Sequence, residues 1–303
     1  KAGIATWDGF CSAHALVLRA NPDVIEPELF PFFLHSDLFM NRAIDISVGS
    51  LSPTINWGTL KHQEFLIPPL ELQECYSKLF WSSNRLIENE LDIIEKKQVL
   101  KHCLQKKYFQ SFENKKSVLV GDVAKLTAGG TPSTQVSEYW KNGTVLWFSS
   151  GEVHKKRVFS TEKKITESAL KNSSAKLIPI HSCLIALAGQ GKTKGSVAIS
   201  EVELSTNQSV AAIMPDESKI EPYYLYHNLD SRYHDFRHIT GKQNSRTGLN
   251  LKILKEFRIA FHDKKERGTI QNIFNQLDES IAVARKKVES SQSLQKILVN
   301  KVF

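Results

Sequence analysis

One helical pattern occurs twice in this chain of 303 residues, and it limits the possible architectures more than any other feature. The first copy runs from about Glu71 to Phe109, and the second runs from about Lys264 to Phe303. Each copy follows a short apolar run that opens with Glu-Phe, at 64–69 and at 256–261. Repeats on this scale indicate a duplicated structural unit, so we expect the two helices to play matching roles in one fold.

Both helical segments carry apolar residues at the spacing of a coiled coil. In the first, an apolar residue recurs every seven positions, at Leu72, Leu79, Leu86, Ile93 and Leu100, and the stripe is widened by Phe80, Ile87 and Ile94. In the second, spacings of four and three run through Ile270, Phe274, Leu277, Ile281, Ala284, Val288, Leu298 and Val302, with Ser291 and Gln295 as polar interruptions. The first helix would span about 58 Å, which few lone globular helices reach. We therefore expect the two helices to form a coiled coil.

The duplication extends beyond the helices. Glu26-Pro27 matches Glu221-Pro222, and Leu34-His35-Ser36 matches Leu229-Asp230-Ser231. The offset stays at about 192 to 195 residues throughout, so residues 1–109 correspond to roughly 195–303. The region 115–194 has no counterpart in the first copy. This pattern predicts one whole unit preceded by the second half of another.

The segment between the helices is rich in strand-forming residues. Short apolar runs alternate with Gly, Ser, Thr and Asn, at 118–120, 145–148, 184–187, 197–199 and 210–213. They predict an α+β domain with a sheet at its core. The run Phe65-Leu66-Ile67 is also expected to be a strand, ended by Pro68-Pro69. The expected divisions are a half-domain at 1–70, a long helix at 71–114, a whole domain at 115–262 and a second long helix at 263–303.

Composition narrows the class of protein. The formal net charge is +8, and the positive field of such a chain attracts polyanions such as nucleic acid. The four cysteines form no Cys-x-x-Cys pair and have no zinc-type spacing, so we expect buried thiols in a reducing cytoplasm and no metal site. No apolar run approaches the length of a membrane helix. Hydrolase and methyltransferase signatures are also missing, which favours a binding protein over an enzyme.

One stretch resembles a phosphate-binding loop, Ala188-Gly189-Gln190-Gly191-Lys192-Thr193. The pattern requires glycine where Ala186 stands, and it requires a helix after the threonine. The residues that follow, 194–199, instead have the pattern of a strand. An ATPase that uses 186–193 stays an alternative, whereas a glycine-rich hairpin tip with two lysines would suit contact with a DNA backbone.

Polar loops of the domain at 115–262 are candidates for reading DNA bases. Arginine pairs with guanine edges, asparagine and glutamine pair with adenine edges, and lysine mostly neutralises phosphate. The alternative for each loop is a solvated surface turn. Trp140 and Trp147 are expected to anchor the core rather than stack on bases. The predicted DNA-binding residues are Thr131, Ser133, Lys155, Lys156, Arg157, Gln190, Lys192, Thr193, Lys194, Lys242, Gln243, Asn244 and Arg246.

The motifs of this domain resemble those of a known family. They are Gly121-Asp122-Val123-Ala124, Gly129-Gly130-Thr131-Pro132-Ser133, Glu138-Tyr139-Trp140 and Trp147-Phe148-Ser149-Ser150-Gly151-Glu152. In this order they resemble the opening of a target recognition domain in the DNA-specificity subunit of type I restriction–modification systems. The junction at 65–74, Phe-Leu-Ile-Pro-Pro-Leu-Glu-Leu-Gln-Glu, is similar to that family as well.

The resemblance implies two recognition domains that each read half of a split DNA target, held apart by two long antiparallel helices. It implies a non-catalytic subunit that binds no cofactor itself. Its partners would be double-stranded DNA, two modification subunits that use S-adenosylmethionine to methylate adenine, and restriction subunits that use ATP and magnesium. The remaining alternative is a structural coiled-coil scaffold that makes no contact with bases.

The sequence departs from this family pattern at its start. The first recognition domain has no counterpart of 115–194, so as written it is expected to be truncated. One interpretation is that residues precede Lys1 and complete the domain, because a bare half-domain would expose apolar edges. The other interpretation is that a second copy of the chain completes it.

Overall fold

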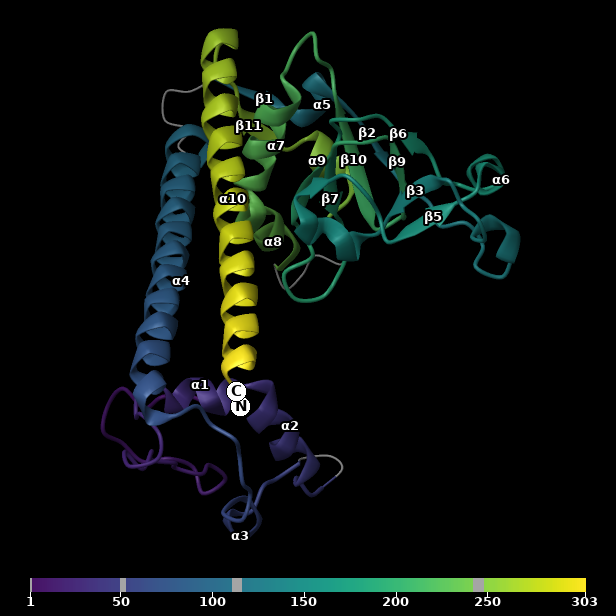
Figure 1. The fold of residues 1–303 in the computed structure, drawn as a ribbon. Coiled ribbons are helices and arrows are strands. Elements are labelled where there is room, and N and C mark those ends of the chain that lie inside the picture. The colour runs from purple at the N-terminus through teal and green to yellow at the C-terminus, as the bar shows by residue number, and fades with distance from the viewer. Residues whose placement is uncertain (1, 50–52, 111–115, 242–247) are drawn as a thin grey trace. The chain divides into compact units, whose positions relative to one another are not determined.

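The computed structural model describes residues 2–49, 53–110, 116–241 and 248–303 (Figure 1). The chain forms two compact units, of which unit 1 contains residues 1–97 and 280–303, and unit 2 contains residues 98–279. The two expected long helices are present as α4 (Leu70–Gln105) and α10 (Lys264–Val302). Each long helix contributes one part to unit 1 and the other part to unit 2, so neither unit is built without them.

Unit 1 is helical where it is regular, and it packs around aromatic side chains. Besides the long helices it contains α1 (Phe30–His35), α2 (Asp37–Asp45) and α3 (Trp57–Leu60). Leu29 and Phe80 are fully buried. The ring of Phe33 lies 5.1 to 5.4 Å from the ring centroids of Phe39, Phe65 and Phe303. The described residues before α1 form neither helix nor strand, and Trp7 and Phe10 on this segment are exposed.

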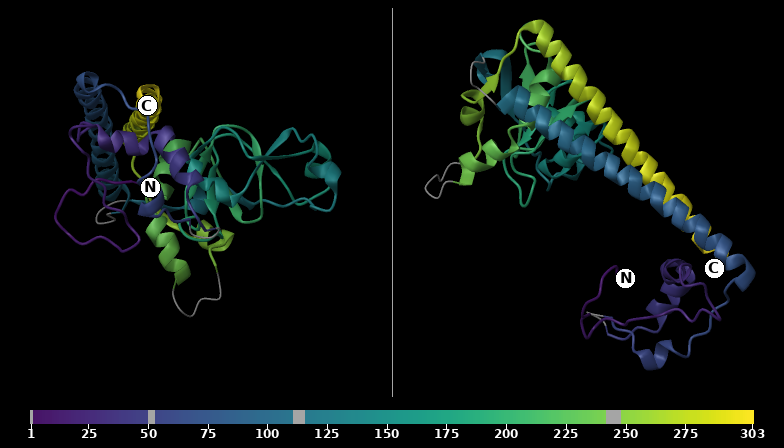
Figure 2. Two further views of the ribbon diagram at one scale, coloured as in Figure 1. Left: turned by 60° about the horizontal axis from the view of Figure 1, so that its bottom comes forward. Right: turned by 90° about the vertical axis from the view of Figure 1, so that its left-hand side faces the viewer.

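The long helices run antiparallel within unit 1 (Figure 2). Gln295 of α10 donates a hydrogen bond to the Phe80 carbonyl of α4 at 3.3 Å, and Lys287 pairs with Glu90. Partner numbers therefore rise along one helix as they fall along the other. The same direction holds in unit 2, where Lys101 pairs with Asp278 at 2.6 Å. The expected antiparallel pairing is confirmed inside each unit.

The row of buried apolar residues on α4 is shifted by one position from the row of leucines that the heptad pattern singled out. Phe80, Ile87 and Ile94 are at most 8% exposed, and α10 contributes Phe274, Ile281 and Val288 to the buried set. The leucine stripe that the heptad pattern singled out is instead exposed by 39 to 65%, at Leu72, Leu79, Leu86, Ile93 and Leu100. Adjacent positions of one wide apolar stripe differ by about 100° around a helix, so only one of the two rows can face the partner.

Cysteine burial also differs from expectation. Cys183 on β7 (Cys183–Ala186) is buried, and burial raises the pKa of its thiol. Cys11, Cys75 and Cys103 are exposed, so the expectation of four buried thiols was wrong. Cys75 and Cys103 each lie three residues after a leucine of the exposed stripe, and positions three apart share a helix face.

The expected strand at Phe65-Leu66-Ile67 is not a strand in the structure. Its counterpart in the second copy is β11 (Arg258–Ala260), which pairs antiparallel with β1 (Ser117–Leu119). No strand of the described part of unit 1 lies beside 65–67. A strand is defined by its hydrogen-bonded neighbour, so the same sequence pattern gives a strand in one copy only.

Unit 2 contains the sheets. A five-stranded sheet has the order β2 (Ala124–Ala128), β10 (Val210–Pro215), β7, β8 (Val197–Ser200) and β4 (Arg157–Val158). A four-stranded sheet has the order β5 (Lys163–Ile165), β3 (Val145–Phe148), β9 (Leu204–Thr206) and β6 (Leu177–Ile178). The expected α+β class is confirmed, and the five strand segments predicted for 115–262 overlap β1, β3, β7, β8 and β10.

Helices cover the five-stranded sheet and join it to the long helices. The short helices of unit 2 are α5 (Val120–Val123), η2 (Ser137–Tyr139), η3 (Ser150–Lys155), α6 (Glu167–Lys171), α7 (Pro222–Asp230), α8 (Tyr233–Gly241) and α9 (Leu251–Lys255). Helix α7 packs against β7, β8 and β11. Phe109, in the π-helical turn η1 (Lys106–Gln110) that follows α4, is fully buried against Tyr224 and Phe274.

Buried polar side chains confirm that the two copies share one construction. Gln73 of α4 is 1% exposed and Arg267 of α10 is 6% exposed. Each side chain contacts the glutamate of the Glu-Pro pair in its own copy. Each also contacts a backbone carbonyl two residues before that glutamate and a second backbone carbonyl two residues before its long helix begins. The partners of Gln73 are Glu26 N, Val24 O and Pro68 O, and those of Arg267 are the Glu221 carboxylate, Lys219 O and His262 O. These equivalent contacts fix the helical offset between copies at 194 residues, from 73 to 267.

Candidate nucleic-acid interface

Three loops leave the five-stranded sheet of unit 2 at the same end. Ala128, the last residue of β2, pairs with Ala211, and Val210 at the start of β10 pairs with Ala186 at the end of β7. The loops that follow β2, precede β10 and follow β7 therefore emerge together. Backbone hydrogen bonds join them, from Gly130 N to Thr206 O and from Leu187 N to Ser209 O, both at 2.8 Å.

The loop 129–134 is held in one shape by close packing. A Cβ atom on Gly129 would lie 2.1 Å from the Thr206 carbonyl oxygen, and one on Gly130 would lie 2.2 Å from Ser174 Oγ. Glycine is therefore required at both positions. The indole nitrogen of Trp147 donates to the Gly130 carbonyl at 3.0 Å. This buried tryptophan is a core anchor, as expected.

The side chain of Thr131 projects from this fixed loop. Its hydroxyl donates to the amide oxygen of Gln208, which is exposed on the loop before β10. Ser133 lies two residues further on, and its carbonyl accepts a hydrogen bond from the Trp140 indole at 3.1 Å. The loop thus presents hydroxyl and amide groups of the kind that contact bases and phosphates.

The segment 187–196 is a hairpin tip between β7 and β8. Cys183 to Ile185 pair antiparallel with Val197 to Ile199, and residues 191–196 form turns rather than a helix. A phosphate-binding loop needs the first turn of a helix at this point to hold the phosphate. The hairpin therefore does not have the geometry that the ATPase alternative requires. Gln190 and Lys192 are exposed at its tip, and Thr193 and Lys194 are half-buried at its base.

Helix α8 supports this hairpin. Gly195, at φ +81°, lies against Phe236, where an added Cβ would be 3.1 Å from the phenylalanine Cβ. Arg237 donates to the Gly191 carbonyl and to the Tyr233 hydroxyl, the latter at 3.1 Å. Arg237 and Tyr233 therefore belong to the same surface as the hairpin, although neither was among the predicted residues. The mixture of Tyr, Arg and His at 233–238 was the available signal.

Four predicted residues lie outside the described part of the chain. Lys242, Gln243, Asn244 and Arg246 directly follow α8 in the sequence. Their role in DNA binding stays a prediction.

The basic cluster 155–157 lies at the other edge of the sheet, where β4 is the edge strand. Each of its cations already has a carboxylate partner: Glu152 for Lys155 at 2.6 Å, Asp230 for Lys156 at 2.7 Å and Glu201 for Arg157 at 2.5 Å. Burial alone would raise the pKa of Glu152, but Lys155 and two backbone N–H groups lower it below the ordinary value. Lys156 nevertheless reaches the base of the hairpin, where its ammonium donates to the Val197 carbonyl at 3.3 Å.

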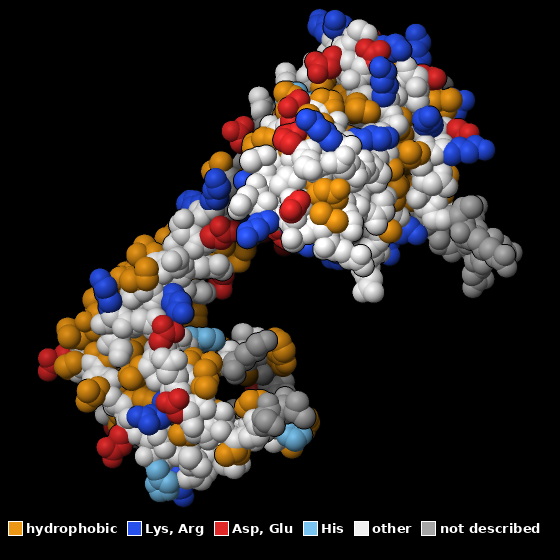
Figure 3. All heavy atoms as spheres, turned by 90° about the vertical axis from the view of Figure 1, so that its right-hand side faces the viewer, with side chains coloured by type: hydrophobic (Ala, Val, Ile, Leu, Met, Phe, Trp, Pro, Cys, Tyr) orange, Lys and Arg blue, Asp and Glu red, His pale blue; other side chains and the backbone are white. Residues whose placement is uncertain are grey.

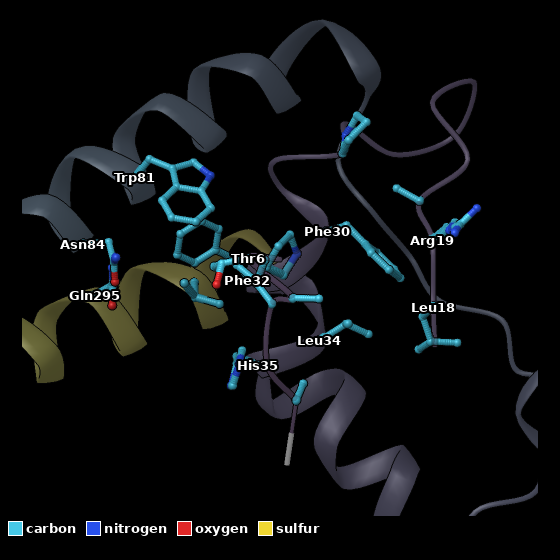
Figure 4. A pocket seen from close by; sticks show the side chains of 18 of the residues that line it. Thr6, Leu18, Arg19, Phe30, Phe32, Leu34, His35, Trp81, Asn84 and Gln295 are labelled. Atoms are coloured by element: carbon cyan, nitrogen blue, oxygen red, sulfur yellow. The ribbon is translucent and has the colours of Figure 1, made fainter. Parts of the chain in front are cut away.

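The rest of the molecule offers other surfaces. Figure 3 shows Lys and Arg side chains mixed with Asp and Glu over one face of unit 2, and exposed apolar side chains along the helices. Unit 1 contains a cavity of about 1120 Å³ that is lined by residues such as Phe30, His35 and Gln295 (Figure 4).

Within the described ranges, no group of three His, Cys, Asp or Glu side chains is arranged to hold a metal ion. Nor does any described helix have the length and apolar character to cross a membrane.

Residues 113–290 match the family described as the type I restriction modification DNA specificity domain. This match covers more than half of the chain, and the chain belongs to that family. The motifs that suggested the resemblance, from Gly129-Gly130-Thr131 to Trp147, lie within the matched residues.

Known relatives agree with this family. The chain is 33% identical over 161 residues to the EcoR124I/EcoR124II specificity subunit of a type I restriction enzyme from Escherichia coli. That match covers 52% of the chain and 40% of the relative, so the chain spans well under two thirds of that protein's length. It is also 22% identical over 313 residues to the putative MjaX specificity subunit of Methanocaldococcus jannaschii, covering 95% of the chain and 69% of the relative.

Solved structures share the fold. The type I restriction–modification S subunit of M. genitalium superposes with a TM-score of 0.65 at 15% identity, over 93% of this chain and 74% of that one. The HsdS subunit of Thermoanaerobacter tengcongensis gives a TM-score of 0.54 at 17% identity, over 94% of this chain and 72% of that one. This chain therefore has the same fold as these S subunits.

Proposed function

We propose that this chain is a DNA-specificity subunit that reads the sequence of double-stranded DNA for a type I restriction–modification complex. One observation carries the proposal within this family. The loops 129–134 and 207–209 and the hairpin 187–196 converge at one end of a sheet, with exposed Thr131, Gln190 and Lys192 among them. Loops held by a rigid sheet are suited to placing side chains against base edges.

The roles within this surface follow from side-chain chemistry. Lys192 and Lys194 would neutralise phosphates, whereas Thr131, Ser133, Gln190 and Thr193 would contact base edges or sugars. Gln208, which accepts a hydrogen bond from Thr131, extends this set. Lys155, Lys156 and Arg157 have intramolecular carboxylate partners, so their contribution would be weaker.

The duplicated construction supports a bipartite target. Unit 2 would read one half-site, the equivalent part of the first copy would belong to the reader of the other, and the helix pair would set their separation. The chain itself would be non-catalytic and bind no cofactor. Modification subunits would bring S-adenosylmethionine and methylate adenine, and restriction subunits would bring ATP and magnesium. Such a complex would act in the cytoplasm.

The exposed leucine stripe of α4 would be the docking surface for these partners. Leu72, Leu79 and Leu86 are 47, 48 and 65% exposed along one face of the helix. Rows of exposed apolar residues on a helix mark sites of protein association. A scaffold without base contacts would use the same stripe, and only DNA sequence preference separates that alternative from the proposal.

Substitution of Lys192 tests the assignment of the hairpin. In a complex assembled with its modification subunits, Lys192→Ala is expected to weaken DNA binding for all sequences alike. It should also lower the slope of log affinity against log salt by about 1, because one phosphate contact is lost. Lys171→Ala, on the exposed helix α6, is the matched control and should leave the slope unchanged. Equal slopes for both variants and the unaltered chain would contradict the assignment.

A further inference from the structure

Unit 2 contains a charge cluster that joins four elements. Asp230, at the end of α7, has a side chain only 11% exposed. Its carboxylate contacts Lys156, from the turn between η3 and β4, at 2.7 Å, and Lys101 of α4 at 3.6 Å. Lys101 in turn lies 2.6 Å from Asp278 of α10. One carboxylate on α7 thus connects the sheets to both long helices.

The lysine that reaches Asp230 is held in an unusual backbone conformation. Lys156 has φ +61° and ψ −56°, a region that residues other than glycine rarely adopt. Its ammonium also donates to the Val197 carbonyl at 3.3 Å, and its own carbonyl accepts from Ile199 N at 2.7 Å. Strain of this kind persists only where surrounding contacts impose it. The backbone contacts of Lys156 with β8 thus fix the turn from which its side chain reaches Asp230.

Asp230 is charged in this setting. Burial alone would raise the pKa of its carboxyl, but Lys156 and Lys101 hold that pKa below the ordinary value. The side chain of Asp230 is 11% exposed and that of Lys156 is 48% exposed, so the carboxylate is the buried member of this pair. A buried carboxylate that loses its cationic partners is an uncompensated charge, which costs more than the loss of a fully exposed pair. The cluster therefore favours one arrangement of the sheets against the helices.

The first copy shows that the helix pair does not itself need these charges. With the offsets of the repeat, the positions of Asp230, Lys101 and Asp278 correspond to His35, Gln295 and Asn84. Figure 4 shows these three side chains around the cavity of unit 1. None of them is a carboxylate or an ammonium. The charged cluster thus occurs in the copy that carries the residues of 115–194, one of which is Lys156.

We propose that Asp230 is a positioning residue that locks the DNA-reading sheets of unit 2 onto the two long helices. Lys101 and Asp278 lie within four residues of positions 97 and 280, where the helices pass into unit 1. This proposal rests on the proposed function, because the lock would then fix the direction in which one half-site reader extends from the spacer. It adds that the cluster sets the spacing tolerance of the target and not its base sequence.

The test uses Asp230→Asn, which keeps the shape of the side chain and removes its charge. Asp216→Asn is the matched control, because Asp216 forms an exposed pair with Lys219 at 3.4 Å. Assembled complexes are compared on DNA targets whose central spacer is lengthened or shortened by about one or two base pairs. Asp230→Asn is expected to reduce the preference for the native spacer roughly tenfold while half-site base preference stays unchanged. Asp216→Asn should change neither.

A second measurement is independent of DNA. Spin labels are placed on exposed Cys103 of α4 and on Lys171→Cys of α6, with Cys11→Ser and Cys75→Ser removing the other accessible thiols. Double electron–electron resonance on the full chain should give a narrow distance distribution for the native lock and for Asp216→Asn. It should give a broader one for Asp230→Asn and for Lys156→Gln.

The two measurements separate the possible failures. A distribution that stays narrow in Asp230→Asn, with circular dichroism showing a folded chain, overturns the lock. A native spacer preference that survives in that variant also overturns its role in spacing. A broadened distribution, in a chain whose native complex prefers no DNA sequence, supports the lock as a structural feature and contradicts the proposed function instead.

Discussion

Burial changes the protonation of His227, a side chain on α7. It is 1% exposed on α7, its Nε2 lies 2.8 Å from Asn275 Oδ1, and its ring stacks on Phe274. Burial lowers the pKa of His227 to about 4, although Asp278 acts in the opposite direction. The folded chain therefore keeps this imidazole neutral at pH values where a free histidine is half protonated.

This lowered pKa predicts a specific dependence of stability on pH. Between about pH 6.5 and pH 4 the unfolded chain binds a proton at His227 that the folded chain does not, so stability falls as pH falls. Within that window, titration of His227 changes the free energy of unfolding by up to about 1.4 kcal/mol per pH unit. Above that window it adds no pH dependence. Urea unfolding monitored by tryptophan fluorescence at several pH values measures it. His227→Gln should flatten the curve, whereas exposed His154→Gln should not, and identical curves would contradict the burial effect.

Other features at residue scale were only partly predictable from sequence. The run Gly129-Gly130-Thr131 was recognised as a motif, but the need for glycine there was not predicted, because it comes from Thr206 and Ser174, which are distant in the sequence. The partners of Lys156 could not be foreseen, since Asp230 is 74 residues away and meets it only through the packing of α7. Gln208 and Arg237 were missed for the same reason: their places depend on strand register and on contact between α8 and the hairpin.

At the scale of elements, the long helices were predicted in part. Their existence followed from the residue pattern and their antiparallel pairing from the family resemblance, but the buried face of α4 followed from neither. Two neighbouring rows, one through Leu72, Leu79 and Leu86 and one through Phe80 and Ile87, have the same seven-residue period. Periodicity alone cannot choose between them. The choice depends on the partner helix and, in a complex, on what covers the other row.

Paired substitutions on α4 test this assignment of faces. Ile87 is 5% exposed and Leu86 is 65% exposed. Ile87→Ala is expected to lower the free energy of unfolding by about 2 to 5 kcal/mol, because it leaves a cavity in the seam. Leu86→Ala should change it by less than about 0.5 kcal/mol in the isolated chain. Urea titration followed by helical circular dichroism compares them, and equal losses would show that the buried row is misassigned.

At the scale of the whole molecule, the repeat predicted more than any motif. The equivalent anchors Gln73 and Arg267, with their matching partners, show that both copies begin their long helix in the same way. The repeat failed at 65–67, where the pattern of a strand lacks the partner that β1 provides for β11. Similarity between the two copies predicts the packing of residues that both copies contain. It does not predict contacts with a segment that only one copy contains, such as β1.

The central claim is that this chain selects a DNA sequence, and selection from random duplexes measures it most directly. The chain, assembled with its modification subunits, is mixed with a pool of randomised DNA at fixed salt, and the bound fraction is sequenced. We expect enrichment of one motif made of two short specific halves with a spacer of fixed length. Specific proteins typically exceed their non-specific binding by about 10³-fold or more. A bound fraction with the same composition as the starting pool would contradict the account, and would leave a scaffold without base contacts.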